Sequence, residues 1–151
     1  MSKIIGNSLT QELIGLFNQK LTTVVMATIT PEGYPHSMPV HLMAASDNKT
    51  IYMALVKAHQ TVANIRANGK AAISVLEGPD ISLTILGTAK VVKETMAGSS
   101  VMCMIEFQVT EIKSDTTPTL IVTEGVRCKH RTEKTAEFFK AMFNELNQGM
   151  S

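Results

Sequence analysis

The sequence contains no tryptophan, only two tyrosines and only two cysteines among its 151 residues. Two cysteines, Cys103 and Cys128, are too few for a disulfide framework, and this predicts a reducing, cytoplasmic setting. The scarcity of aromatic side chains argues against a surface that stacks the bases of single-stranded nucleic acid. These absences point away from secreted disulfide scaffolds and from nucleic-acid binders.

Net charge is also nearly absent, because 14 Lys and Arg balance 13 Asp and Glu. A chain so close to neutrality has no electrostatic reason to bind nucleic acid or an anionic membrane. No apolar run reaches the roughly 18 residues that span a bilayer, and the N-terminus lacks the apolar core of a signal peptide. Hydrophobic residues nevertheless make up 44%, so we predict one folded domain over residues 1–151.

Several familiar catalytic signatures are missing as well. The sequence has no P-loop, no G-x-G-x-x-G fingerprint and no G-x-S-x-G nucleophile elbow. Cys128 and His130 lie close together without a second pair of ligands, so no metal site is predicted. A catalytic triad assembled from distant residues stays open, because its members need not be neighbours in sequence.

The apolar pattern predicts a mainly β protein with flanking helices. Turn signals such as Pro31-Glu32-Gly33 separate stretches rich in β-branched residues. The predicted strands are 22–30, 34–45, 50–56, 70–76, 81–92, 101–112 and, as a candidate seventh, 118–126. Helical spacing predicts helices over 9–17, after residue 56 and over about 132–147.

Six or seven strands joined mostly by tight turns favour a small antiparallel barrel, with an open sandwich as the competing architecture. Gly87 interrupts the fifth strand, as at a bulge or a barrel corner. Pro35 and Pro39 lie within the second strand. Because proline cannot donate to a β-ladder, we expect that strand to face an edge, a bulge or a ligand. The short helix after the third strand is expected to plug or cap one end.

The stretch from Lys57 to Arg66 is the strongest candidate for a binding site. It leads from the third strand into the short helix, whose first N–H groups favour an anion. Lys57 adds a cation, and Gln60 and Thr61 add donors. The alternative is an ordinary capped helix with a solvated lysine. A second basic cluster at 127–131 is either a solvated loop or another anion-contacting patch.

The order of these elements and several short motifs resemble the pyridoxamine 5′-phosphate oxidase-like family of FMN-binding split β-barrels. The resemblance covers roughly residues 13–112. It depends on Val25-Met26-Ala27-Thr28, Gly33-Tyr34-Pro35-His36-Ser37-Met38-Pro39-Val40, Ile51-Tyr52-Met53, His59-Gln60-Thr61-Val62-Ala63-Asn64-Ile65 and Leu86-Gly87-Thr88-Ala89.

The resemblance implies a homodimer with FMN bound at the subunit interface. Implied contacts to the flavin ring are Met38, Pro39, Val40, His41, Ala54 and Leu55, and implied contacts to the phosphate are Lys57, His59, Gln60 and Thr61. Many members carry an Arg-Lys or Lys-Thr pair where this chain has Gln60-Thr61. Lys57 would then have to supply the cation, since charge-assisted hydrogen bonds are roughly twice as strong as neutral ones.

The predicted function is therefore that of an FMN-binding, flavin-dependent oxidoreductase acting on an unidentified small molecule. His41 or His59 could transfer a proton, and no catalytic residue is assigned. A non-catalytic flavin carrier or sensor, and a barrel that has lost flavin binding, are the alternatives, with haem or a deazaflavin as other ligands. The true oxidase carries paired arginines near its C-terminus, which Arg127 to Arg131 resemble only superficially, so pyridoxamine phosphate oxidation is not predicted.

Overall fold

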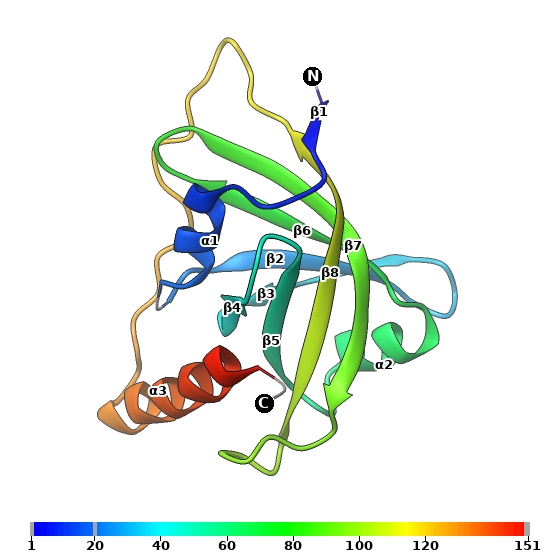
Figure 1. The fold of residues 1–151 in the computed structure, drawn as a ribbon, viewed down its shortest axis with the longest axis vertical. Coiled ribbons are helices and arrows are strands. Elements are labelled where there is room, and N and C mark those ends of the chain that lie inside the picture. Colours follow the sequence, from blue (N-terminus) through cyan, green and yellow to red (C-terminus); the bar gives the residue numbers. More distant parts are fainter. Residues whose placement is uncertain (1, 20, 150–151) are drawn as a thin grey trace.

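The computed structural model describes residues 2–19 and 21–149. Its strands are β1 (Lys3–Gly6), β2 (Val24–Ile29), β3 (Pro35–Val40), β4 (Met43–Ala45), β5 (Thr50–Val56), β6 (Lys70–Glu77), β7 (Ile81–Lys93) and β8 (Met102–Ser114). Its helices are α1 (Gln11–Phe17), α2 (Gln60–Ala67) and α3 (Glu133–Gln148). These elements form a curved antiparallel sheet, with α1 and α3 on the left of the view in Figure 1 and α2 on the right.

The curvature of the sheet brings its two ends together. The strands pair in the order β3-β2-β6-β7-β8-β5-β4, and β1 pairs with β8 outside this path. Strands β3 and β4 lie at opposite ends of the order, yet only His41 and Leu42 separate them along the chain. In a flat sheet the gap would be about 29 Å, whereas three residue steps reach about 10 Å. The sheet therefore curls into a half-barrel, and the predicted mainly β split-barrel fold is confirmed.

One predicted strand, 34–45, is divided in the structure, so the expectation of a continuous strand is wrong. Strand β3 pairs with β2 up to the pair of Val24 and Val40, and β4 then pairs with β5. The chain changes partner at this point, and hydrophobic alternation carries no information about which strand is the neighbour. Strand β3 lies at the edge of the sheet, as Pro35 and Pro39 require.

The predicted seventh strand, 118–126, is also wrong. These residues form no strand, and Leu120 and Ile121 are 76% and 71% exposed. The segment is held by Asp80 instead, whose N–H donates to the carbonyl of Val122 and whose carboxylate accepts from the Val122 N–H. A short strand that the sequence did not reveal, β1, pairs with the end of β8.

Local features follow the sequence closely. The Thr10 hydroxyl accepts from the Leu13 N–H at 3.2 Å and so caps α1. At Gly87 the register between β7 and β8 shifts, as expected of a bulge. A side chain at position 87 would meet the Gln108 carbonyl and the Phe107 ring. Glycine is therefore needed where β7 bends across β8.

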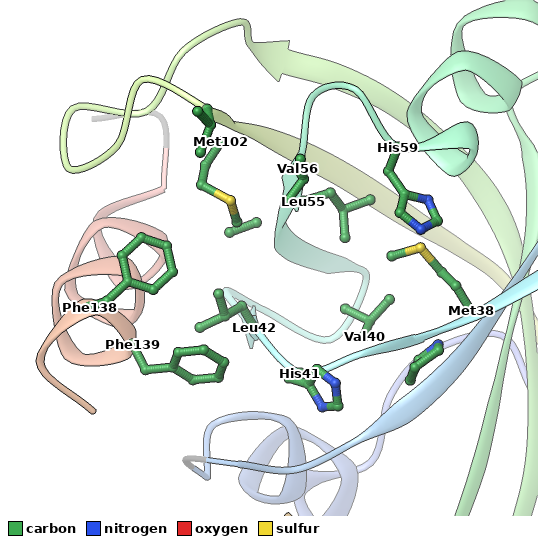
Figure 2. Close-up of a pocket in the computed structure, with 13 residues that line it drawn as sticks. Met38, Val40, His41, Leu42, Leu55, Val56, His59, Met102, Phe138 and Phe139 are labelled. Atoms are coloured by element: carbon green, nitrogen blue, oxygen red, sulfur yellow. The ribbon is translucent and has the colours of Figure 1, made fainter. Parts of the chain in front are cut away.

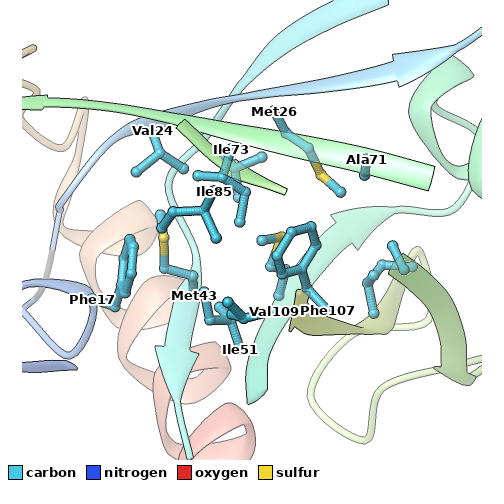
Figure 3. Close-up of a cluster of buried hydrophobic side chains, with 14 of the residues drawn as sticks. Phe17, Val24, Met26, Met43, Ile51, Ala71, Ile73, Ile85, Phe107 and Val109 are labelled. Carbon is cyan, nitrogen blue, oxygen red and sulfur yellow. The ribbon is translucent and has the colours of Figure 1, made fainter. Parts of the chain in front are cut away.

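Two apolar clusters fill the molecule. The main one lies inside the half-barrel and includes Phe17, Met26, Met43, Ile51, Ile73, Ile85 and Phe107 (Figure 3). Helix α2 packs against β2, β3 and β7 and adds Val62 and Ile65, as expected of a helix that caps the barrel. The second cluster lies under α3 and contains Leu42, Ala44, Ala54, Met96, Met102, Met104, Met142, Phe143 and Leu146.

Neighbouring residues of β5 pack in different apolar clusters. Leu55 packs in the main core and Ala54 in the second cluster, because successive side chains of a strand point to opposite faces. The end of β5 thus connects the barrel interior to the surface that α3 covers. Within the described residues, no helix has both the length and the apolar character needed to cross a membrane.

Candidate functional site

A cavity of ≈ 320 Å³ opens where the two ends of the sheet meet (Figure 2). Its walls come from the β3–β4 junction, the end of β5, the start of α2, the start of β8 and α3. The lining residues are Met38, Pro39, Val40, His41, Leu42, Ala54, Leu55, Val56, His59, Val101, Met102, Phe138 and Phe139. This volume lies at the lower end of the range for sites that bind small organic molecules.

The chemistry of the cavity is apolar and uncharged. Among the described residues that line it, His41 and His59 are the only titratable side chains, and none is Lys, Arg, Asp or Glu. Aliphatic, thioether and aromatic groups form the rest of its surface. Such a lining suits a flat, uncharged ring system, with two imidazoles available for hydrogen bonding.

His41 lies at the wall and contacts two side chains outside the cavity. Its Nδ1 is 2.8 Å from Thr23 Oγ1 and 4.0 Å from Cys128 Sγ. Thr23 Oγ1 is in turn 3.4 Å from the Cys128 sulfur. Burial lowers the pKa of His41 below its ordinary value, because desolvation disfavours the charged imidazolium. Burial therefore favours the neutral form of the His41 imidazole.

His59 caps the helix that begins beside the cavity. Its Nδ1 accepts from the Thr61 N–H at 3.2 Å, and its carbonyl accepts from the Val62 N–H at 3.0 Å. The start of α2 is thus capped by its own chain, as the alternative reading of this stretch expected. The ring of His59 lies 5.9 Å from that of His36, centroid to centroid.

Two buried polar atoms flank this cap without a hydrogen-bond partner in the described part of the chain. They are His36 Nε2, from β3, and Thr61 Oγ1, from the first turn of α2. An unsatisfied buried polar group costs about 1–3 kcal/mol, so each calls for an explanation. His36 lies within one of the motifs that carried the resemblance, but it is not among the predicted contact residues.

Lys57 and Arg66, the cations at the two ends of α2, are bound to other side chains and are not among the residues that line the cavity. Lys57 Nζ donates to Thr95 Oγ1 at 2.6 Å, and the Arg66 guanidinium binds the Glu94 carboxylate. The hydrogen bond from Arg66 is the main reason that the pKa of Glu94 lies below its ordinary value. The Gln60 amide is likewise engaged, donating to Asn64 Oδ1 at 2.8 Å.

The structure therefore brings most, but not all, of the predicted contact residues together. Those that line the cavity are Met38, Pro39, Val40, His41, Ala54, Leu55 and His59. Lys57, Gln60 and Thr61 lie beside it and are not among the lining residues.

Six of the lining residues are not among the predicted contacts, namely Leu42, Val56, Val101, Met102, Phe138 and Phe139. Leu42 and Val56 adjoin predicted contacts and could have been found by extending those runs. Phe138 and Phe139 belong to a distant helix. The apolar stripe of that helix predicts a buried face but does not indicate what it buries against.

Comparison with known families identifies the class of protein. The family model for pyridoxamine 5′-phosphate oxidase matches residues 10–124. The chain belongs to this family, whose members bind flavins. The matched region ends before α3 begins. A comparison of the sequence with curated proteins found no match.

Solved structures share the fold at low sequence identity. A Lactobacillus delbrueckii protein named for pyridoxamine 5′-phosphate oxidase is 21% identical, with 74% of this chain and 98% of that chain covered and a TM-score of 0.63. HupZ from Group A Streptococcus is 23% identical, with coverage of 78% and 99% and a TM-score of 0.61. An FMN-binding protein from Syntrophomonas wolfei is 15% identical, with coverage of 71% and 88% and a TM-score of 0.56.

Proposed function

We propose that this protein binds FMN in the cavity beneath α3 and uses it for redox chemistry on a small molecule. One observation carries the proposal: an apolar cavity adjoins two buried polar atoms, His36 Nε2 and Thr61 Oγ1, that have no hydrogen-bond partner among the described residues. FMN combines a flat ring, which suits the apolar cavity, with an anionic phosphate, which suits the two buried polar atoms. Membership of a flavin-binding family supports the same assignment.

The ring half of FMN fits the apolar walls. Met38 and Val40 line the cavity from β3, and Ala54 and Leu55 line it from β5. Contact with these side chains removes the ring from water, which is favourable by about 25 cal/mol per Å² of apolar surface. His41 adds a hydrogen-bonding group for the polar edge of the ring.

The phosphate half fits the start of α2, where the Thr61 hydroxyl is available to donate and His36 Nε2, from the neighbouring β3, can donate when that nitrogen carries the ring proton. Binding there would satisfy both groups and so remove the cost of leaving them unpaired. The missing cation is the weak point of this site. We propose that Lys57 leaves Thr95 and turns toward the phosphate, exchanging a neutral acceptor for a charge-assisted bond.

A bound flavin supplies one- and two-electron transfer, and the chain supplies binding, orientation and proton transfer. The apolar walls exclude water from the ring. His41, kept neutral by burial, is the side chain that we assign to accept a proton at the cavity wall.

We also propose that the working form is a homodimer. Val56 and Val101 line the cavity, yet they are 47% and 58% exposed. A second copy that covered this rim would bury both and close the site. Sedimentation of the flavin-loaded protein would report a mass of two chains, and a single-chain mass would contradict this part of the proposal.

Titration of the purified protein with FMN tests the assignment. We expect a perturbed flavin spectrum, and about 2.7 kcal/mol of added stability at a ligand concentration 100 times Kd. The Lys57→Ala variant should bind FMN at least about tenfold more weakly, because a charge-assisted bond is lost. Lys70→Ala, at the start of β6 just after α2 ends, is the matched control and should bind like the wild type. Absence of any flavin binding by the wild type would refute the proposal.

A flavin carrier or sensor without a substrate is the second candidate. The observation that favours it is the small number of titratable groups among the lining residues, limited to His41 and His59. Turnover separates the two functions. Oxidation of NAD(P)H with a small acceptor, dependent on added FMN, supports the enzyme, and tight FMN binding without turnover supports the carrier.

A further inference from the structure

One wall of the cavity is aromatic. It is formed by α3 and lies opposite the wall formed by the strands. Figure 2 shows Phe138 and Phe139 on the helix side, with Leu42, Val40 and Leu55 across from them. Both phenylalanines are only partly buried, so they keep apolar surface directed at the cavity. The family model ends at residue 124, and this wall therefore lies outside the matched region.

Helix α3 is capped at its beginning and anchored to the rest of the protein near its end. Thr132 and Thr135 form a reciprocal capping box at the N-terminus. Glu145, near the C-terminus, accepts from the N–H groups of Ala97 and Gly98, at 2.8 and 2.9 Å, and from Lys93 Nζ. Residues between these two points are buried in the second cluster, namely Met142 and Phe143. The phenylalanines thus belong to a packed helix.

The rings are also oriented by one another. Phe139 makes edge-on contacts with His130 at 5.0 Å, with Phe138 at 6.1 Å and with Phe143 at 6.4 Å, measured between ring centroids. Tilted pairs at these separations are favoured by the ring quadrupoles. Phe139 is therefore preorganised, and a ligand that packs against it has little side-chain freedom to remove.

We propose that Phe138 and Phe139 form a ring-binding subsite that holds the flat, uncharged ring system of the flavin against the strands. This inference rests on the proposed function, and it deepens it by assigning the ring to a wall built from the C-terminal helix. The subsite contributes by apolar and aromatic contact alone. It therefore acts equally on any ligand with the same ring, whether or not that ligand carries a phosphate.

Lumiflavin, which has the ring without the ribityl phosphate, separates this subsite from the phosphate contacts. Affinities for FMN and lumiflavin are measured by flavin absorbance and fluorescence on the full chain. We expect Phe138→Ala and Phe139→Ala each to weaken both ligands by a similar factor of about ten. Thr61→Val, which removes only the hydroxyl near the expected phosphate, should weaken FMN and leave lumiflavin unchanged. Lys140→Ala, an exposed change on the same helix, is the matched control.

The outcomes separate the two proposals. If the wild type binds FMN but the phenylalanine variants bind like Lys140→Ala, the subsite is refuted while the proposed function stands. If the phenylalanine variants weaken lumiflavin binding but the wild type binds FMN no more tightly than lumiflavin, the subsite stands and the FMN assignment fails. Binding of neither ligand refutes both. Phe138→Leu and Phe139→Leu keep the apolar bulk and lose only the aromatic ring, so unchanged affinity in the folded leucine variants refutes the aromatic part of the contact.

Discussion

The Arg127 guanidinium donates two hydrogen bonds to the carboxylate of Glu77, at 2.9 Å to Oε2 and 2.6 Å to Oε1. Glu77 is the last residue of β6, and Arg127 lies in the segment that leads to α3. The N–H groups of Gly78 and Gly125 donate to the same carboxylate. One side chain thus connects the sheet to the segment that carries the aromatic wall.

This pairing predicts a specific acid sensitivity. The hydrogen bonds from Arg127 lower the pKa of Glu77 from 4.5 to about 2. A carboxyl group with a depressed folded-state pKa stabilises the fold fully above its unfolded pKa and loses that contribution as the pH falls. Between pH 4.5 and about 2, the free energy of unfolding should therefore fall less steeply for Glu77→Gln than for the wild type. Urea unfolding measures this, with Glu124→Gln as control, and parallel curves for Glu77→Gln and wild type would contradict it.

A substitution at Gly125 tests how closely the segment that leads to α3 approaches strand β6. A side chain at this position would collide with the backbone carbonyl of Leu76, which cannot move without disturbing β6. We expect Gly125→Ala to lower the free energy of unfolding by about 1–3 kcal/mol, as overpacking does. Gly15→Ala is the matched control, because nothing lies within 4 Å of an added methyl there. As a helix-interior change it should stabilise α1 by about 0.5–1 kcal/mol. Equal effects of both variants in urea unfolding would contradict the close approach.

The two cysteines should differ sharply toward a thiol reagent. Cys103 is fully buried, and desolvation raises the pKa of its thiol, whereas Cys128 is exposed beside His41. Because the thiolate is the reactive form, a chromogenic disulfide should label one thiol in the native protein and two after unfolding. Cys128→Ser should remove the native reaction entirely. Fast labelling of two thiols under native conditions would show that Cys103 is accessible.

Glu145 should be important for both stability and ring binding. Its carboxylate is largely buried, which raises its pKa, but the bonds from Lys93, Ala97 and Gly98 outweigh this and lower the pKa overall. Glu145→Ala leaves two N–H groups and a lysine without their acceptor, so we expect a loss of about 2–3 kcal/mol in unfolding free energy. Since this contact positions α3, lumiflavin affinity should fall as well. An exposed neighbour on α3, Asn144→Ala, provides the control.

The pH dependence of this effect has a defined sign. The pKa of Glu145 is depressed in the folded state, so its contribution is complete above the unfolded value of 4.5 and decreases as the pH falls below it. The stability difference between wild type and Glu145→Ala should therefore shrink in acid. A difference that grew on acidification would contradict the assignment of a charged Glu145.

Much of the fold could be predicted because its signals are local. The irregularity at Gly87 follows from the conformational freedom of one residue, and the edge position of Pro35 and Pro39 is one of the three that a residue without an N–H allows. The segment 118–126 shows the limit of such reasoning. Its apolar residues suit a strand, but a strand needs a neighbour with free backbone groups, and Asp80 offers only one pair of contacts.

The candidate site was predictable in part for the same reason. Residues on β3 and β5 were assigned through motif resemblance, and the structure places them around one cavity. The direction of Lys57 was not predictable, because its partner Thr95 lies 38 residues away in sequence. That His36 Nε2 finds no hydrogen-bond partner within the described part of the chain was equally unpredictable, because hydrogen-bond pairing of a buried atom depends on the packed structure.

The sequence by itself determined the class of fold, the positions of its turns and caps, and the family to which the chain belongs. Periodicity, turn chemistry and short motifs encode these features within a few residues of each other. The tertiary structure alone decided that the sheet curls until β3 and β4, the two ends of its strand order, come together. It alone also decided that α3 places Phe138 and Phe139 over the junction of these two strands. That arrangement depends on which strands pair and which apolar faces bury one another, and both are settled by packing across the whole chain.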